Sequence, residues 1–427
     1  MRIRTITIGQ IIPFLYKNET IESFLEDKLP KFQNFNNELI EEFEKVDIKV
    51  ETKRICTQPL FSYEEQLIYQ KNLQDTLGRI EDQFFLIQRL FKKYEIDYFA
   101  CCMMLAQNLM DFGIFEKLLL KQVPPLIKIF DNFFTSLPVA STKEGINIAA
   151  LKSGANIILE NAKIDPFNNL QFCVSSNVTP NIPFFPAAYH HSDQPGFSLG
   201  LEMADEVSRV FRNASTLTEA KNNLRDKFNE IYEKISNIAE KVGEKHNIEL
   251  IGMDFSPAPF PKLTRSIGYA IENLKFDYFG SHGSLIAIAL IKQCMPKKDK
   301  VIGFSSFMMP VLEDYVIAKR LAENKFNLDT LLLYSTMCGT GLDCIPLPGD
   351  ITARELFYIL LDMCTISVIL DKPLTARLMP IPGKQAGDPV EFEFEYFAPS
   401  KVMDIRRLDV AREDDLFSRK EKSFKFL

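Results

Sequence analysis

The sequence predicts an α/β fold, in which a mainly parallel sheet or barrel is surrounded by outer helices. Segments with alternating β-branched residues are separated by longer segments with helical spacing along most of the 427 residues. Hydrophobic residues make up 46% of the chain, which is enough for a large core. Because no linker divides the chain, we expect a single domain over residues 1–427, with 401–427 as a peripheral charged tail.

The first half of the chain alternates between the two patterns. Residues 2–8 alternate polar with β-branched side chains, which indicates a strand rather than a signal peptide. Periodicity does not decide whether the apolar segment 97–104 is a strand or a helix. The other predicted strands are 48–56, 170–174 and 197–202, and the predicted helices are 21–46, 64–94, 113–134 and 146–160.

The most regular helical pattern covers residues 217–242. Thr216 and Glu219 form a capping box before it, and Gly243 follows where a C-cap belongs. Its apolar stripe predicts an amphipathic covering helix and would also suit a subunit contact, so we expect a homo-oligomer. Beyond it we predict strands at 248–255, 301–304, 374–379 and 390–394, helices at 285–293, 310–322 and 352–370, and a helix from about residue 263.

Composition and missing motifs exclude several function classes. The net charge is −7 and both signs are interspersed, so no basic face for nucleic acid is expected. No apolar stretch is long enough for a membrane span. Eight cysteines without a CxxC motif indicate reduced thiols and a cytoplasmic protein. Without GxGxxG, P-loop, HExxH or GxSxG, no nucleotide cofactor, zinc protease or serine hydrolase is expected.

The segment 331–350 has the highest density of reactive and permissive residues. Two glycines lie between Cys338 and Cys344, and Asp343 precedes the second cysteine. Glycine permits backbone conformations that side chains disfavour, so this loop could carry a thiol and a carboxylate into a cavity. The spacing of the cysteines is a poor match to structural zinc sites. A tight turn with two buried thiols is the alternative.

A second candidate is the segment 280–284, GSHGS, before a predicted helix. Gly280, Ser281 and Gly283 would expose free N–H groups to a carboxylate or phosphate. The helix dipole would favour the neutral form of His282, which could then act as a base. A tight turn with a capping serine is the alternative interpretation.

Two further segments supply polar side chains. Asp254 and Ser256 end a predicted strand before rigid prolines, and Arg265 follows and could hold an anion. Tyr189 and His190 lie in a polar, proline-rich segment and could contribute hydrogen bonds to a pocket. Adjacent histidines rarely bind one metal together, so a divalent metal is left open and its identity is unknown. Turn capping and solvated side chains are the alternatives for these residues.

With these residues in hand, the chain resembles an uncharacterised bacterial and archaeal family, domain of unknown function 711. The resemblance is strongest from Asp254 to about Ile405. It includes the motifs Pro257-Ala-Pro259, Gly280-Ser-His282-Gly283, Gly341-Leu342-Asp343 and Thr375-Ala376-Arg377 in the order of the family.

This resemblance implies the fold of glycyl-radical enzymes such as pyruvate formate-lyase. That fold is a ten-stranded α/β barrel with an internal finger loop, and Cys338 would be the tip of the finger. Radical enzymes need an Arg-Val-x-Gly-Tyr-like motif, whereas the corresponding region, 377–387, lacks it. No radical is therefore assigned to Gly383 or Gly387.

The first hypothesis is a cytoplasmic enzyme that acts on a small anionic metabolite, a carboxylate or a phosphate. Cys338 would be the nucleophile or acid, His282 the base, and Asp254 and Asp343 would orient them. The alternatives are a non-catalytic metabolite sensor that uses the same pocket and a structural or assembly protein that acts through its long helices.

Overall fold

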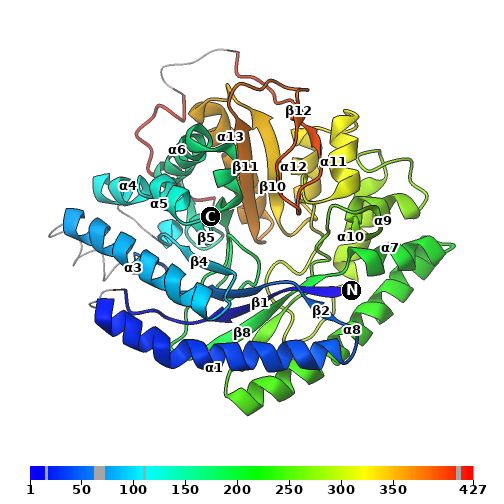
Figure 1. Cartoon of the computed structure of the whole chain (residues 1–427). Helices are drawn as coiled ribbons and strands as arrows, with labels where there is room; N and C mark the ends of the chain where they lie inside the picture. Colours follow the sequence, from blue (N-terminus) through cyan, green and yellow to red (C-terminus); the bar gives the residue numbers. More distant parts are fainter. Residues whose placement is uncertain (15–17, 62–72, 109–111, 410–414, 427) are drawn as a thin grey trace.

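A large mixed sheet forms the centre of the molecule, and helices cover its outer face (Figure 1). The computed structural model describes residues 1–14, 18–61, 73–108, 112–409 and 415–426. The main path of the sheet runs through β10 (Gly341–Pro348), β11 (Leu374–Ile381), β7 (Phe172–Ser176), β5 (Phe133–Ser141), β4 (Tyr98–Cys102), β3 (Lys53–Cys56), β1 (Arg2–Gly9), β8 (Gly196–Glu202) and β9 (Glu249–Asp254).

The strands of this path run in two directions. Neighbouring strands are parallel except at β11–β7 and β1–β8, so both ends of the sheet oppose its five central strands. This confirms a mainly parallel sheet with outer helices. Within the described ranges β9 and β10 are not hydrogen-bonded to each other, so the structure does not show a closed ten-stranded barrel. The relation to glycyl-radical enzymes stays a prediction.

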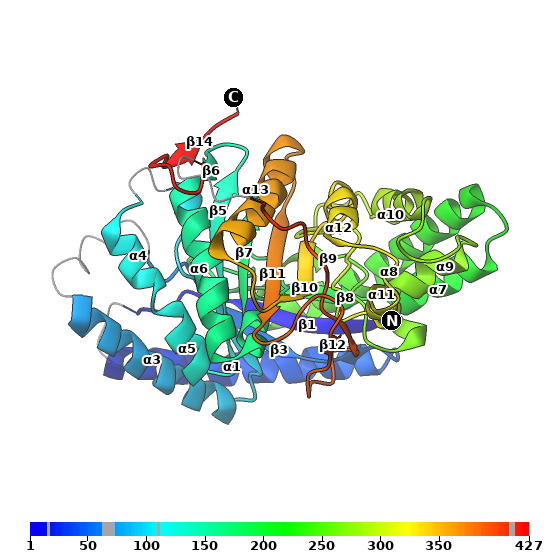
Figure 2. The ribbon, with the colours of Figure 1, turned by 90° about the horizontal axis from the view of Figure 1, so that it is seen from above.

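Short strands extend the edges of the main sheet. β2 (Lys49–Val50) pairs with β1, and β6 (Gly145–Asn147) pairs with β5 and with β14 (Ser423–Phe424). Figure 2 shows β14 beside β6, near the C-terminus. A separate small sheet consists of β12 (Pro389–Val390) and β13 (Ser400–Lys401). The C-terminal tail therefore pairs with the rest of the protein at β13 and β14.

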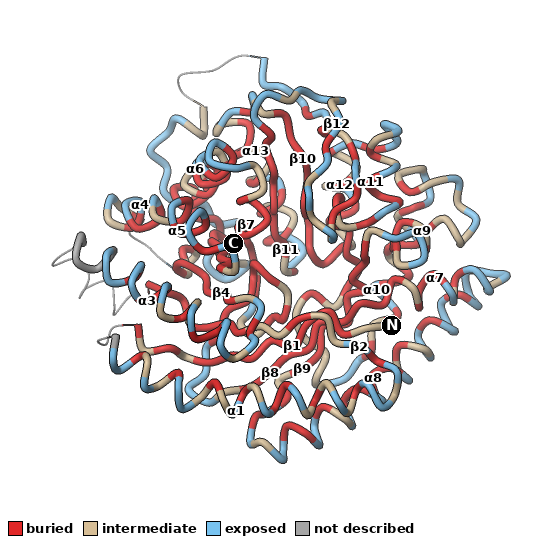
Figure 3. The backbone as a smooth tube through the Cα atoms, in the orientation of Figure 1, coloured by how far each residue is buried: buried red, intermediate tan, exposed pale blue. Residues whose placement is uncertain are grey.

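Helices surround the sheet, and Figure 3 shows their outward sides exposed and the strands buried. α1 and α8 lie side by side along β1 and β8 (Figure 1), and α6 and α13 pack against each other beside β11. The helices are α1 (Asn18–Glu44), α3 (Leu73–Lys93), α4 (Ile114–Leu120), α5 (Val123–Ile129), α6 (Ile148–Ile164), α7 (Ala204–Asn213), α8 (Leu217–His246), α9 (Ile267–Asn273), α10 (Ser284–Gln293), α11 (Tyr315–Ala322), α12 (Leu328–Ser335) and α13 (Ala353–Ile369).

The amphipathic helix predicted at 217–242 forms as α8. The Thr216 hydroxyl accepts a hydrogen bond from the backbone N–H of Glu219, as expected of its N-cap. The helix does not end at Gly243, because Asn247 adopts the left-handed conformation with φ 55° and is the C-cap. Gly243 instead allows close packing, since a Cβ there would lie 2.6 Å from the carbonyl oxygen of Ile248.

Several other expectations need correction. The predicted helix 113–134 consists of two short helices, α4 and α5, followed by the start of the unpredicted strand β5. The undecided segment 97–104 contains β4. Of the predicted strand 390–394, only Val390 lies in a strand, β12. The predicted helix 64–94 is seen from Leu73 onward, and its beginning lies outside the described residues.

The predicted finger loop is not a loop over most of its length. Residues 328–335 form α12, a short turn carries Cys338, and 341–348 form β10, which pairs with β11. The glycines and prolines that predicted a loop lie within β10 or next to it. Gly341 takes a positive φ of 85° where the strand begins, a conformation that glycine adopts readily. The segment therefore presents Asp343 from a strand of the sheet.

A helix that crosses a membrane needs about 20 predominantly apolar residues. In the part of the chain that the structure describes, none is both long and apolar enough to cross a membrane.

Candidate functional site

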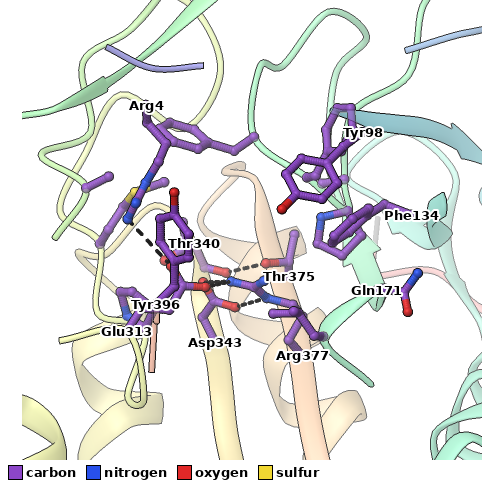
Figure 4. A pocket seen from close by; sticks show the side chains of 18 of the residues that line it. Arg4, Tyr98, Phe134, Gln171, Glu313, Thr340, Asp343, Thr375, Arg377 and Tyr396 are labelled. Carbon is purple, nitrogen blue, oxygen red and sulfur yellow. Dashed lines mark hydrogen bonds and ion pairs between the residues drawn. The ribbon is translucent and has the colours of Figure 1, made fainter. Parts of the chain in front are cut away.

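The sheet curves around a cavity of about 170 Å³, shown from close by in Figure 4. Its lining includes Arg4 from β1, Arg54 from β3 and Tyr98 from β4. It also includes Asp343 from β10 and Arg377 from β11, at the opposite end of the sheet. Side chains from distant strands meet there because the sheet bends, which makes this cavity the best candidate for a functional site.

The cavity lies where the central strands begin. Arg54, Tyr98 and Phe134 are among the first residues of β3, β4 and β5. Ala258 and Pro259 line the same cavity but follow the C-terminal end of β9. The starts of β3, β4 and β5 therefore meet the segment that follows β9 at this cavity. The reversal of strand direction between β1 and β8 brings strand starts and strand ends to one side of the sheet.

Irregularities in the strands position two of the charged lining residues. Arg4 is an extra residue between the partners of Leu201 and Gly200 in the β1–β8 pairing. The β10–β11 pairing shifts between Leu342 and Ile345. Such bulges change the direction of the side chains they contain. The bulge in β10 contains Asp343 and also Cys344, which has a φ of 50° that is uncommon for a residue with a side chain.

Arg377 and Asp343 form a buried ion pair that faces the cavity (Figure 4). Arg377 Nε donates to Asp343 Oδ1 at 2.5 Å, and Nη2 donates to Oδ2 at 3.0 Å. Nη2 also donates to Glu313 Oε1 at 2.8 Å. These contacts make a bidentate pair with fixed geometry. Both Asp343 oxygens and two of the three guanidinium nitrogens of Arg377, Nε and Nη2, are therefore occupied within the protein.

Arg4 is also paired with carboxylates of the protein. Arg4 and Arg265 each contact both Glu51 and Glu202, which gives a ring of alternating charges. Arg4 Nη2 also donates to the carbonyl oxygen of Pro259 at 2.5 Å. Burial raises the pKa of Glu202 to about 7, and the charge of Glu51 acts in the same direction. Arg265, predicted to bind an anion, is thus part of this ring.

Arg54 differs from the other two arginines of the cavity. Its Nε donates to the Thr52 hydroxyl at 2.9 Å, and its guanidinium lies 5.3 Å and 5.0 Å from the rings of Tyr98 and Phe185. Among the described residues no carboxylate lies within ion-pair distance of it. Burial and the charge of Arg4 lower its pKa to about 10, so the side chain is a cation at neutral pH. Arg54 can therefore pair with an anionic ligand.

Aromatic side chains form much of the remaining wall. Phe134 and Phe185 pack against each other with ring centroids 5.7 Å apart. Phe394 and Tyr396 come from the segment before β13, and the Arg4 guanidinium lies 4.9 Å from the Tyr396 ring. Figure 4 shows Tyr98 and Phe134 on the side of the cavity opposite Glu313. The site thus combines charged groups with an apolar wall, which suits a ligand with both characters.

Asp254, Ser256 and Cys338 are brought together around one loop, residues 303–307, and none of the three lines the cavity. Asp254 accepts hydrogen bonds from the N–H groups of Phe304 and Ser305, and the Ser256 hydroxyl accepts one from the N–H of Ser306. The fully buried Cys338 thiol donates to the carbonyl oxygen of Phe307 at 3.1 Å. Burial raises the pKa of Asp254. These contacts hold the loop that carries Phe304 into the cavity.

The residues of the GSHGS segment lie at the start of α10, away from the cavity lining. The Gly280 N–H donates to the Ser284 hydroxyl, and the Ser281 hydroxyl donates to the Tyr278 carbonyl. Gly283 is the N-cap of α10, with φ 100°. His282 is exposed, whereas Cys338 is buried. The hypothesis of a paired thiol and imidazole gains no geometric support from these positions.

Tyr189 and His190 are buried beside the cavity region. The Tyr189 hydroxyl donates to the Val178 carbonyl at 3.1 Å, and its ring packs with Phe304 and Ala258. His190 Nδ1 lies 2.7 Å from Asn181 Oδ1. Burial lowers the pKa of His190. Both side chains are hydrogen-bonded within the protein and stabilise the wall that contains Phe304 and Ala258.

Sequence reasoning did not select five charged lining residues, Arg4, Arg54, Asp131, Glu313 and Arg377. A signal existed for the arginines, because each interrupts a short segment of strand-forming residues in which one face is buried. A charged residue on the inner face of a strand needs a partner or a ligand. The strand bulges and the bend of the sheet could not be predicted from that pattern.

A protein site for a metal such as zinc needs three or four ligating side chains close together. In the described ranges no three His, Cys, Asp or Glu side chains are grouped in a way that could hold a metal ion.

Comparisons with known proteins agree with the resemblance seen in the motifs. The family model described as "Uncharacterised ACR (DUF711)" matches residues 1–398. A UPF0210 protein of Pyrobaculum aerophilum is 36% identical over 264 residues, which cover 59% of this chain and 58% of that protein. A UPF0210 protein of Neisseria meningitidis serogroup C is 30% identical over 292 residues, which cover 65% and 64%. The chain thus spans about three fifths of the length of these relatives.

Proposed function

We propose that this chain, which belongs to the DUF711 family of uncharacterised proteins, is an enzyme whose substrate is a small anionic metabolite bound through Arg54. The observation that carries the proposal is the pairing state of the three arginines in the cavity. Arg4 and Arg377 are engaged by carboxylates of the protein, whereas Arg54 has no carboxylate partner among the described residues. A partly buried cation of this kind is stabilised by an anion.

The shape and composition of the cavity support a small substrate. Four of its charged groups, those of Arg4, Arg54, Asp343 and Arg377, lie on strands of the sheet, which hold side chains more precisely than loops do. Phe134, Phe185 and Tyr98 supply an apolar wall beside Arg54 and reduce its access to water. Cys338 and His282 are not part of this proposal, because the thiol is buried outside the lining and the imidazole is exposed.

The test is ligand binding by the full chain and by the Arg54→Gln variant, with benzoate, isocaproate and inorganic phosphate as probes. Thermal unfolding with increasing probe concentration reports binding, since a ligand at 100 times its Kd stabilises by about 2.7 kcal/mol. Loss of one or two charge-assisted hydrogen bonds should weaken binding about 10- to 100-fold. Arg54→Lys should have an intermediate effect, because lysine keeps the charge but not the bidentate geometry.

Arg89→Gln is the matched control, since Arg89 pairs with Glu22 on the outer helices and does not line the cavity. It should leave the affinity of every probe unchanged. Equal affinity of the wild type and Arg54→Gln for all bound probes would refute the role of Arg54. NMR spectra of bound compounds, followed over hours, test the catalytic part. A compound that binds and is converted supports an enzyme, whereas binding without conversion of any compound supports a sensor.

A further inference from the structure

Glu313 presents a carboxylate oxygen to the cavity that no donor occupies in the described part of the chain. Its Oε1 accepts from Arg377 Nη2 at 2.8 Å and from the Cys344 thiol at 3.4 Å. The cation beside its Oε2 is Arg4, whose Nη2 lies 3.9 Å away, which is beyond hydrogen-bond distance. Although burial opposes ionisation, the charges of Arg377 and Arg4 lower the pKa of Glu313. Oε2 is therefore an available acceptor with negative charge.

Arg54 and Glu313 line the same cavity without forming an ion pair. The charge of Glu313 nevertheless acts on Arg54 and favours its charged form. Both side chains are only partly buried, and two opposite charges in such positions lose part of their solvation without gaining a contact. A ligand that carries a negative group and a positive donor would satisfy both at once.

The charges of the residues that line the cavity also indicate a ligand with both a positive and a negative group. The ionised groups among the described lining residues are three arginines (Arg4, Arg54 and Arg377) and three acids (Asp131, Glu313 and Asp343). The formal charges of this wall cancel, which suits a ligand that adds a positive group to its negative one. The cavity has a volume of about 170 Å³. An engineered apolar protein cavity of about 150 Å³ binds benzene, so the apolar part of a ligand here is limited to one small ring or a branched chain.

From these observations we infer that the ligand is a zwitterion, an amino carboxylic acid with a small apolar side chain. Its carboxylate pairs with Arg54, its ammonium group donates to Glu313 Oε2, and its side chain packs against the aromatic wall around Phe134. This inference rests on the proposed function, because it concerns the same cavity and the same role of Arg54.

Matched triples of compounds test the inference by isothermal titration calorimetry. Valine, leucine and phenylalanine are compared with the acids that lack the ammonium group (isovalerate, isocaproate and 3-phenylpropionate) and with the amines that lack the carboxylate. We expect at least one amino acid to bind the wild type about tenfold or more tightly than its two counterparts. Glu313→Gln should remove the preference over the deaminated acid, since the amide keeps the shape but not the charge.

Glu51→Gln is the matched control, because Glu51 also contacts Arg4 but lies outside the cavity lining. It should retain the preference for the amino acid. If the deaminated acids bind as tightly as the amino acids and Arg54→Gln weakens both, the proposed function stands and the zwitterion inference is wrong. If no compound of either class binds, or if Arg54→Gln leaves every affinity unchanged, both fail.

Discussion

Lys372 should make the stability of this protein rise at alkaline pH. The side chain is 9% exposed, and its Nζ donates to the carbonyl oxygen of Ser335 at 2.7 Å and to that of Cys338. It thus closes the C-terminal end of α12 and holds the turn before β10. Burial lowers the pKa of Lys372 from 10.5 to about 8. The cost of burying this charge disappears when the folded protein releases the proton.

The sign and size of the effect follow from linkage. Between pH 8 and 10.5 the unfolded chain retains the proton that the folded protein has lost, so the free energy of unfolding increases with pH. With these two pKa values, the contribution of Lys372 grows by about 2 kcal/mol between pH 7.5 and pH 9.5. In Lys372→Met this increase is absent, and the hydrogen bonds to Ser335 and Cys338 are lost at every pH.

The assay is urea unfolding of the wild type and Lys372→Met at pH 7.5, 8.5 and 9.5, with a reductant present. The difference between the two proteins cancels the titration of all other groups, so it should widen by about 2 kcal/mol over this range. Lys163→Met, at an exposed lysine of α6, is the control and should follow the wild type at each pH. A wild-type–variant difference that stays constant within about 0.5 kcal/mol would refute the reasoning.

Three further predictions concern buried groups around the site. Asp314 is the N-cap of α11, and its carboxylate also accepts hydrogen bonds from the Ser266 hydroxyl and the Ile267 N–H. Asp314→Ala should therefore lower the free energy of unfolding, measured in urea, by at least about 2 kcal/mol. A smaller loss would contradict this role. Gly303→Ala should lower Tm, because φ is 71° and the new Cβ would collide with the Asp254 carboxylate; an unchanged Tm would exclude that collision. All eight cysteines are buried, so Ellman's reagent should react slowly with Cys338 and the rest until urea is added; one fast thiol in the native protein would contradict this.

Local patterns were sufficient for much of the fold. Helical spacing predicted α1 and α8 with nearly correct ends, although α1 contains Pro30 and α8 passes Gly243. Alternation predicted β1 and β8, because each has one face against the helices. The segment 341–348 was misjudged as part of a loop, since its glycine and prolines are typical of turns although it forms the strand β10.

Sequence patterns identified fewer residues of the candidate site than elements of the fold. Asp343 was selected from its glycine-rich surroundings, and it does line the cavity, but the neighbouring Cys338 does not. Arg54 was recognised only as one residue of an alternating strand. Its importance depends on which other arginines are already paired, and those pairs join residues far apart in the sequence, such as Arg377 with Glu313.

The sequence alone determined the α/β class, most helices and the family, because these depend on the periodicity of side chains and on local motifs. Only the tertiary structure decided where a ligand could bind. Two reversals of strand direction and two bulges turn Arg4, Arg54 and Asp343 toward one cavity, and hydrogen bonds between distant segments remove Cys338 from it. Charges act through distances in space, and those distances exist only once the sheet has bent.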